Sequence, residues 1–409
     1  ALSEINYRKY RFSDALAYID RAESIATEYN DRPESGRLYY TKGLILSAIG
    51  EEDKAYDYFH KAAYAYDYKC SAMLKIGLAD IKRKDYRAAV RHLRAASEGN
   101  CNSVLAPAFS AYGKYLSGER QTAVKELEKC LEKDRLNIFA RFFLVRIRRE
   151  YEAFILSIRT DMTQTMLDIC GYLFECGLTE EMEELLEIVK KHKRLYAMPE
   201  YLLGYLRKEN NLKEFPEEGI AFPSRIFEMK VLQWVCEVSP RDFTAHYFLG
   251  ILFYGKGNYA EGMRLFRAAN DIRKDYRALR NLAVGCYSHE RNIALSKKYM
   301  REAVSLAPKG NKQILFEYAY FLAKTNQNPQ KIVDIIEERD VWRDEIAVEL
   351  ARAYNHLGRP DKALEVLLSR KFVACEGGEH YIADQYMFAH YLKGREYFLR
   401  GDYLSAIGE

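Results

Sequence analysis

The sequence has few of the features that mark a membrane, secreted or disordered protein. Only 9 of its 409 residues are proline. No apolar run approaches the ~18–20 residues that a membrane-spanning helix needs. The first residues do not combine a charged segment with an apolar stretch, so no signal peptide is visible. Hydrophobic residues make up 48% of the chain and charged residues 30%, which argues against disorder. We therefore expect a soluble, helix-rich protein.

Charge of one sign and paired cysteines are also missing. The chain has 63 basic and 59 acidic residues, and this near balance gives no case for nucleic acid or a membrane surface as a main partner. The eight cysteines stand singly, with no Cys-x-x-Cys motif, so neither a disulfide framework nor a metal-binding motif is predicted. Isolated thiols suit a reducing compartment, and we expect a cytoplasmic protein.

Sequence motifs for catalysis are missing as well. The glycines at 255, 257 and 262 do not have the spacing of a dinucleotide-binding turn, and no histidine follows His289-Glu290 at the spacing of a zinc protease. Glu376 and Glu379 could act as an acid–base pair, but a polar turn before a helix explains them better. We predict no catalytic residue, no cofactor and no bound metal.

The chain does contain a repeated spacing of small and large residues. A small residue is followed twelve places later by a second, then by a large apolar residue four places on and a small residue three places on. Three copies begin 34 residues apart: Gly43, Ala55, Phe59, Ala62; Gly77, Ala89, Leu93, Ala96; and Ala111, Ala123, Leu127, Cys130. Later copies are Gly250, Gly262, Phe266, Ala269; Ala351, Ala363, Leu367; and Gly394 with Ala406.

This spacing predicts pairs of closely packed helices. A small residue in the middle of each helix lets two backbones approach, and the large residue fills the space beside it. The residues between the two small positions contain turn signals, such as Gly50, Gly118 and Gly358, and Pro360 suits the first turn of a helix. One such pair cannot bury its apolar face alone, so neighbouring pairs must stack.

The pattern resembles the tetratricopeptide repeat, which has a period of ~34 residues. Leu249-Gly250-x-x-Phe253 matches the first helix of that signature, and Pro240 and Pro308 stand where the family places its helix-ending proline. The resemblance implies an all-α, right-handed superhelical solenoid. With the weaker copies included, we expect about twelve antiparallel helix pairs.

The copies suggest two arrays joined by a loop. Residues 1–210 form the first array, with degenerate repeats near 145–190, and residues 226–409 form the second, which is truncated in its last pair. We therefore expect the sequence to be part of a longer chain. Residues 211–225 contain two prolines and predict a surface insertion, a hinge or a segment packed in the groove. Residues 371–380 predict a second loop.

A closer resemblance concerns the second half of the chain. Phe222-Pro-Ser-Arg225, the segment from Leu350 to Gly358, the segment from Leu367 to Phe372 and Glu376-Gly-Gly-Glu379 occur in this order. This order resembles bacterial proteins in which a galactose-mutarotase-like β domain precedes a tetratricopeptide array. The resemblance implies an N-terminal β domain as a partner and a connection to carbohydrate. The sequence itself contains no such domain.

A ligand-binding groove is expected on the first helices, which line the concave side in tetratricopeptide arrays. Tyrosine is frequent, with 33 residues, and Tyr and Arg give large contact areas and bidentate pairing. The residues predicted to line this groove are Tyr40, Tyr112, Tyr115, Tyr247, Tyr254, Arg277, Arg280, Tyr287, Arg352, Tyr391 and Arg395. The alternative is that many of these tyrosines pack between repeats.

The sequence thus predicts a scaffold that presents a Tyr- and Arg-rich groove to a polypeptide or to another domain of its own full-length chain. Leu74, Leu78, Val284 and Val348 stand where some relatives carry a Lys and Asn clamp for a peptide carboxylate, so that clamp is not expected. The alternative function is the non-catalytic, substrate-positioning part of a carbohydrate-active bacterial protein. The oligomeric state is left open.

Overall fold

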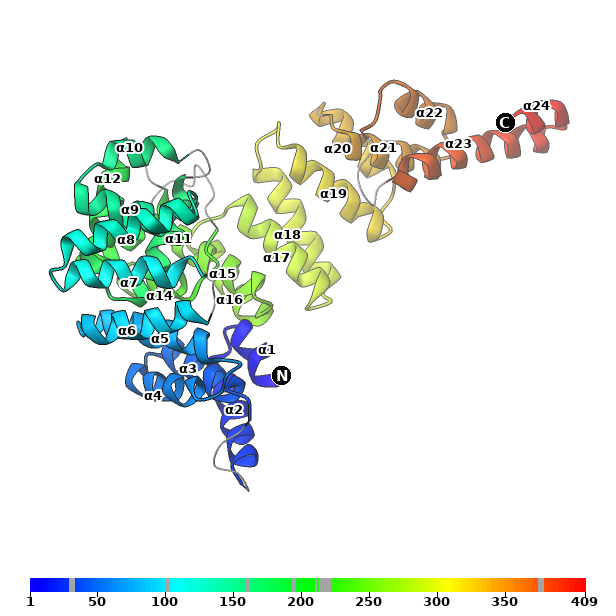
Figure 1. Ribbon diagram of the computed structural model, residues 1–409. Helices are drawn as coiled ribbons and strands as arrows, with labels where there is room; N and C mark the ends of the chain where they lie inside the picture. Colours follow the sequence, from blue (N-terminus) through cyan, green and yellow to red (C-terminus); the bar gives the residue numbers. More distant parts are fainter. Residues whose placement is uncertain are drawn as a thin grey trace. The chain divides into compact units, whose positions relative to one another are not determined.

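The computed structural model describes residues 1–28, 34–99, 103–158, 162–192, 196–209, 212, 222–340, 342–373 and 379–409. These residues form 24 α-helices and no strand, as the repeat predicted (Figure 1). The chain separates into two compact units, unit 1 (Ala1–Leu265) and unit 2 (Phe266–Glu409). None of the described helices combines the length and the apolar character needed to cross a membrane.

The helices follow one another as short-turned hairpins. Those that lie in unit 1 or begin in it are α1 (Leu2–Arg8), α2 (Phe12–Ala26), α3 (Arg37–Ile49), α4 (Glu52–Ala63), α5 (Lys69–Lys82), α6 (Tyr86–Glu98), α7 (Leu105–Leu116), α8 (Arg120–Lys133), α9 (Ile138–Arg148), α10 (Tyr151–Ser157), α11 (Met162–Glu175), α12 (Thr179–His192), α13 (Ala197–Arg207), α14 (Ile226–Val238), α15 (Phe243–Gly255) and α16 (Tyr259–Ile272). Those of unit 2 are α17 (Tyr276–Ser288), α18 (Ile293–Leu306), α19 (Lys312–Lys324), α20 (Gln330–Arg339), α21 (Asp344–His356), α22 (Pro360–Leu368), α23 (Glu379–Leu399) and α24 (Tyr403–Gly408).

The small and large residues of the repeat meet as predicted. A Cβ atom added to Gly43 in α3 would lie 2.7 Å from the ring of Phe59 in α4. A Cβ atom added to Gly77 in α5 would lie 2.5 Å from Cγ of Leu93 in α6. A side chain at either crossing would therefore overlap the large residue unless that residue or the helices shifted. This contact confirms the tetratricopeptide-like helix pair.

The turns between paired helices follow the sequence signals. Gly50 ends α3 with a φ of 89°, the left-handed conformation that glycine adopts without strain. Lys84 takes the same place after α5 with a φ of 61°, and Asp85 then caps α6 by accepting the N–H of Ala88 at 3.0 Å. Pro360 stands in the first turn of α22, where its missing N–H costs nothing.

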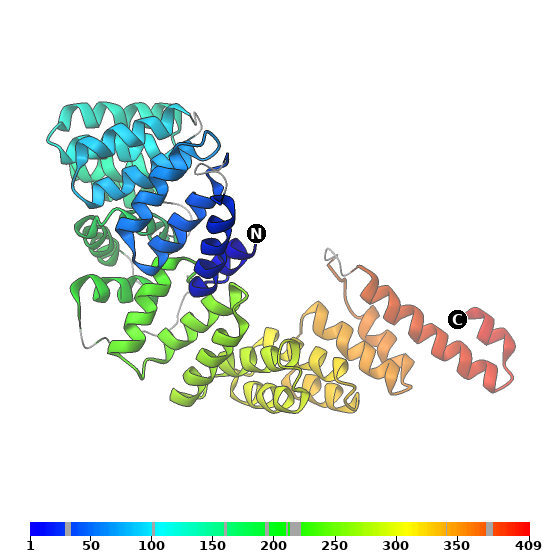
Figure 2. The ribbon, with the colours of Figure 1, turned by 90° about the horizontal axis from the view of Figure 1, so that it is seen from below.

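The first helices of consecutive pairs form a layer of their own. In unit 2, α19 packs on α21 and α21 packs on α23, while each second helix packs on its own partner and the next first helix. Figure 2 shows these hairpins in succession. In unit 1, α5, α7 and α9 are in contact in the same way. Of the residues that the sequence assigned to the groove, Tyr112 and Tyr115 lie on α7, Arg352 on α21, and Tyr391 and Arg395 on α23.

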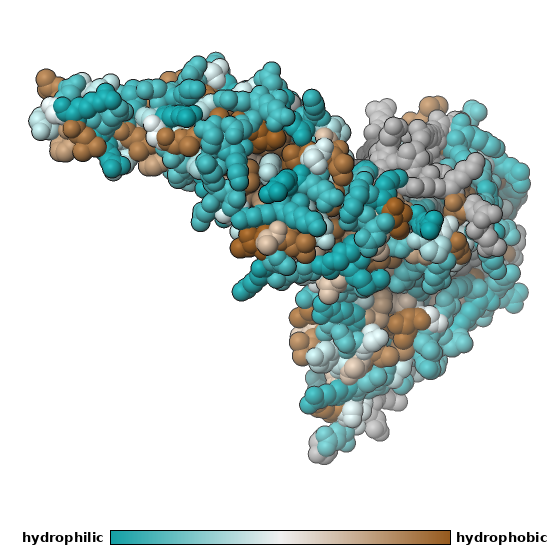
Figure 3. All heavy atoms as spheres, turned by 180° about the vertical axis from the view of Figure 1, so that it is seen from behind, coloured by the Kyte–Doolittle hydropathy of each residue, from teal (hydrophilic) through white to brown (hydrophobic). Residues whose placement is uncertain are grey.

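The last described pair, α23 and α24, carries exposed apolar side chains. α24 buries no residue. Leu399, Leu404 and Ile407 are 72%, 86% and 83% exposed, and Figure 3 shows hydrophobic surface in brown at this end of the described residues.

Several sequence predictions concern residues at the edge of what the structure describes. Within 145–190, where the sequence predicts degenerate repeats, α10 has only seven residues, and the prediction of degenerate repeats stays a prediction. The loops predicted at 211–225 and 371–380 lie largely outside the described residues. The division at 211–225, the right-handed sense of the superhelix and the number of about twelve helix pairs stay predictions.

The described cysteines are free thiols, and burial raises the pKa of Cys170 to about 12.

Replacing Gly77 with Val should destabilise unit 1, because the new side chain overlaps Leu93 across the α5–α6 crossing. We expect a loss of about 1–3 kcal/mol, measured as a lower urea midpoint of the helical circular dichroism signal. Gly255→Val is the matched control, since a Cβ atom there has no neighbour within 4 Å. Adding Leu93→Ala to Gly77→Val should recover part of the loss. Equal effects at Gly77 and Gly255 would contradict the packing argument.

Candidate functional site

Unit 1 curls until helices far apart in the sequence meet. Nζ of Lys75 in α5 lies 2.7 Å from Oε2 of Glu175 at the end of α11. The hydroxyl of Tyr10, after α1, donates to the carbonyl of Ser224, before α14, at 2.9 Å. The α11–α12 turn also meets α5, because a Cβ atom on Gly177 would lie 2.8 Å from the Lys82 stem. The early helix pairs are therefore closed against α11 and α14.

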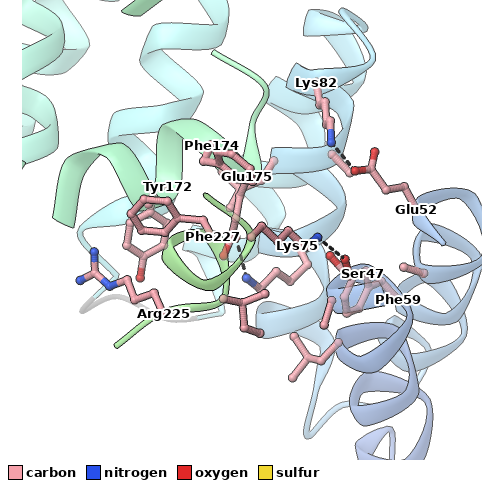
Figure 4. A pocket seen from close by; sticks show the side chains of 18 of the residues that line it. Ser47, Glu52, Phe59, Lys75, Lys82, Tyr172, Phe174, Glu175, Arg225 and Phe227 are labelled. Carbon is pink, nitrogen blue, oxygen red and sulfur yellow. Dashed lines mark hydrogen bonds and ion pairs between the residues drawn. The ribbon is translucent and has the colours of Figure 1, made fainter. Parts of the chain in front are cut away.

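This closure leaves a cavity of about 380 Å³ between the early helices and α11 and α14 (Figure 4). We call it the closure cavity. Its lining residues are Tyr7, Tyr10, Leu44, Ser47, Ala48, Glu52, Ala55, Tyr56, Phe59, Lys75, Leu78, Ala79, Lys82, Gly171, Tyr172, Phe174, Glu175, Ser224, Arg225, Ile226, Phe227 and Lys230. Aromatic rings and charged side chains thus line the same cavity.

The pair of Lys75 and Glu175 sets the electrostatics of one wall. Burial alone would lower the pKa of Lys75, but the Glu175 carboxylate outweighs burial and the net pKa is raised. Burial raises the pKa of the nearby Tyr7 to about 12, and burial also raises the pKa of Tyr40. These two hydroxyls therefore stay protonated at neutral pH and can donate hydrogen bonds.

The opposite wall is held by the start of α14. The buried carboxylate of Glu228 accepts the backbone N–H groups of Ser224 at 2.7 Å and Arg225 at 2.8 Å. Nη1 of Arg225 donates to the carbonyl of Leu167 at 2.9 Å, and the same guanidinium pairs with Asp168. This cap fixes where α14 begins and brings Arg225 against α11.

Unit 2 carries a relay of paired polar groups across its first helices. Arg280 of α17 makes two hydrogen bonds to Glu317 of α19, at 2.6 and 2.7 Å. Gln313 donates to Glu317 at 2.8 Å, and Arg343 before α21 donates to Gln313 at 2.7 Å. Burial would raise the pKa of Glu317, but Arg280 and Gln313 outweigh it and lower the pKa. The charges of this relay are already matched.

The predicted groove residues fall in both units and differ in exposure. Tyr40, Tyr112, Tyr115, Tyr247 and Tyr254 lie in unit 1, and Arg277, Arg280, Tyr287, Arg352, Tyr391 and Arg395 lie in unit 2. The exposed ones are Tyr287, Tyr391 and Arg395, whereas Tyr112 and Tyr247 are buried and the others are half-buried. The structure brings Tyr40 close to Lys75 of the closure cavity. Arg280 is hydrogen-bonded to Glu317.

Tyr112 and Tyr247 offer almost no surface to a ligand, at 0% and 8% exposure. The hydroxyl of Tyr112 donates to Glu181 at 2.8 Å and accepts from Arg146 at 2.9 Å. Its ring stacks on Phe143 with centroids 4.1 Å apart. For Tyr112, the alternative of packing between repeats therefore describes the observed environment.

Most of the remaining residues have neighbours within their own repeat. Tyr40 packs on Phe59 and Tyr68, Tyr115 stacks on Tyr112, and Tyr254 packs edge-on against Tyr259. Arg277 pairs with Asp275 at 2.7 Å and Arg352 with Glu349 at 3.6 Å. Tyr287 meets Phe321 edge-on, and Tyr391 stacks on Phe388.

Sequence reasoning missed the charged residues of the closure cavity. Arg225 belongs to a segment, Phe222 to Arg225, that the sequence did single out, and this segment was the available signal. Lys75 and Lys230 stand on helices that the repeat predicted. Their meeting with Glu175 and Ser47 joins residues 100 and 183 positions apart, so no local spacing could have found it.

No family model matches the chain. Solved structures similar to it include yeast Tom70, at 13% identity over 96% of this chain and 94% of that chain, with a TM-score of 0.32. Another is YrrB, described as a TPR protein with an unusual peptide-binding site, at 15% identity over 54% of this chain and 94% of that chain, with a TM-score of 0.21. A third is TTC0263, a thermophilic TPR protein of Thermus thermophilus, at 14% identity over 62% of this chain and 99% of that chain, with a TM-score of 0.22. These scores are low, and the repeat fold rests on the contacts within this chain.

Replacing Glu175 with Gln should destabilise unit 1, because the Lys75 ammonium stays in the closure cavity without its carboxylate. The two side chains are 23% and 44% exposed, so we expect a loss of about 1 kcal/mol in the free energy of unfolding. Folding raises the pKa of Lys75, so this contribution is fully present below its unfolded pKa of ~10.4 and is lost only as the pH rises through the higher folded value. The difference in urea midpoint should therefore be constant between about pH 6 and pH 9.

Glu98→Gln is the control in the same unit. Its partner Arg94 is 77% exposed and Glu98 is 66% exposed, and such a surface pair contributes at most ~0.5 kcal/mol. A Glu175 effect as small as that of Glu98, or one that disappears well below pH 9, would contradict the role given to the pair.

Proposed function

We propose that the chain is a non-catalytic protein-interaction scaffold whose unit 2 presents its first helices to an extended polypeptide. The observation that carries the proposal is the packing of α19 on α21 and of α21 on α23 in one layer. Side chains from several consecutive repeats can then contact one extended ligand. Binding by such layers is the usual use of stacked helical repeats.

The chemistry of this surface favours aromatic contact over charge attraction. Tyr287 on α17 and Tyr391 on α23 are 39% and 61% exposed. Arg395, which follows Tyr391 on α23, is exposed as well. Tyrosine gives a large contact area and a wet hydroxyl at low entropic cost. The charge of Arg280 is matched by Glu317 and is not available to a ligand. We therefore expect a peptide with apolar or aromatic side chains rather than a strongly acidic one.

The partner is either a separate polypeptide or another domain of the full-length chain. The second option takes its support from the resemblance to bacterial proteins with a galactose-mutarotase-like β domain. The carbohydrate-associated alternative rests on the same resemblance. The proposal that the chain is not an enzyme rests on the missing catalytic motifs.

Replacing Tyr287 and Tyr391 with Ala should weaken peptide binding by at least about tenfold, the effect of losing ~1.4 kcal/mol of contact. Peptides selected from a random displayed library on the whole chain would be labelled, and their affinities measured by fluorescence anisotropy. Tyr64→Ala with Tyr66→Ala is the matched control, because these tyrosines are 86% and 95% exposed in the turn after α4. Loss of affinity in the control alone, or in neither variant, would contradict the proposed surface.

A further inference from the structure

We propose that the closure cavity of unit 1 binds a small organic anion, a carboxylate carried on an aromatic or aliphatic body. This function is independent of polypeptide binding by unit 2, because it uses other helices and another class of ligand. Its support comes from the charges, the walls and the size of the cavity.

Cations outnumber carboxylates in the lining of the cavity. The four cationic side chains are Lys75, Lys82, Arg225 and Lys230, and the two carboxylates are Glu52 and Glu175. Each carboxylate already has a lysine partner, Lys82 for Glu52 and Lys75 for Glu175 (Figure 4). Arg225 is paired with Asp168, outside the lining. The described lining therefore has a surplus of positive charge.

Lys230 is the source of the unmatched charge. Its Nζ donates to the carbonyl of Ser47 at 3.4 Å, a long bond to a neutral acceptor. Among the residues that the structure describes, no carboxylate forms an ion pair with it. Burial lowers the pKa of Lys230, and Lys82 lowers it further against the opposing effect of Glu52. An anion beside Lys230 would supply the missing partner for this ammonium.

Seven of the residues that line the cavity around these charges are aromatic. Phe59 reaches the cavity from α4, and Phe174 and Phe227 reach it from α11 and α14 with ring centroids 5.7 Å apart. Tyr7 and Tyr172 add rings on two sides. Rings of this kind pack well against a flat or branched apolar body. The arrangement therefore suits a ligand with one charged end and one apolar end.

The size of the cavity favours a compact molecule over an extended chain. Its volume of about 380 Å³ is near the lower end of the ~300–1,000 Å³ usual for small-molecule sites. Ser47 belongs to α3, Lys82 to α5 and Lys230 to α14. A ligand held among them would contact both sides of the closure and would stabilise the curled form of unit 1.

The test uses 3-phenylpropionate as the probe and isothermal titration calorimetry on the whole chain. The uncharged 3-phenylpropanamide has nearly the same shape, so it separates the charge from the apolar body. We expect the carboxylate to bind at least ten times more tightly than the amide. A tetrapeptide ending in phenylalanine offers the same carboxylate on a longer chain, and we expect it to bind more weakly than the free acid.

Variants then place the probe in the cavity. Lys230→Met should weaken 3-phenylpropionate binding at least tenfold, while Lys230→Arg should retain most of the affinity. Lys129→Met, which removes an exposed lysine on α8, should leave it unchanged. The carboxylate–amide comparison needs only the unaltered chain, so it decides the matter even if Lys230→Met fails to fold.

The proposal is overturned if the unaltered chain does not bind 3-phenylpropionate or binds the amide equally well. It is also overturned if a folded Lys230→Met keeps full affinity, or if the peptide binds and the free acid does not. Loss of peptide binding in the unit 2 tyrosine variants would not bear on this result. The two proposals can therefore fail separately.

Discussion

The close approach of two helices at a small residue is the contact on which the rest of the structure depends. Gly43 meets the ring of Phe59, and Gly77 meets Leu93, at distances that leave no room for a side chain. Such a pair buries one face and leaves the other to the next pair, as the packing of α20 on α21 and of α22 on α23 illustrates. Stability is therefore a property of neighbouring hairpins, and the chain can extend or curl without a single central core.

Curling in unit 1 brings distant helices of this array together around the closure cavity. Each hairpin turns slightly against the last, and by α11 and α14 the chain has returned to α5 and to the segment after α1. The contacts made there are polar, with Lys75 on Glu175 and Tyr10 on Ser224. Polar contacts with a cavity between them suit a closure that a ligand can strengthen.

The sequence predicted the features that depend on residues close together in the chain. It missed the closure of unit 1, which depends on the relative orientation of many successive helix pairs. The helix pairs and the turn at Gly50 follow from spacings within about one repeat, and the structure has them. The closure follows from small rotations summed over several repeats, which no local pattern records. Tyr112 shows the same limit on a smaller scale, because the period places it on a first helix but cannot tell which neighbours surround it. Here those neighbours are Glu181, Arg146 and Phe143.

The two units differ in whether their charged side chains have partners of opposite charge. On the first helices of unit 2, Arg280, Glu317 and Gln313 satisfy one another, so a ligand gains little from its own charge. In unit 1 the closure brings Lys230 close to Lys82 and Glu52. The residues that line the cavity there include more cations than carboxylates. The Lys230 ammonium is partly buried and has no anion beside it among the described residues, so a bound carboxylate would offset part of its desolvation. The same helix-pair repeat thus gives charge-matched first helices in unit 2 and a cavity with surplus positive charge in unit 1.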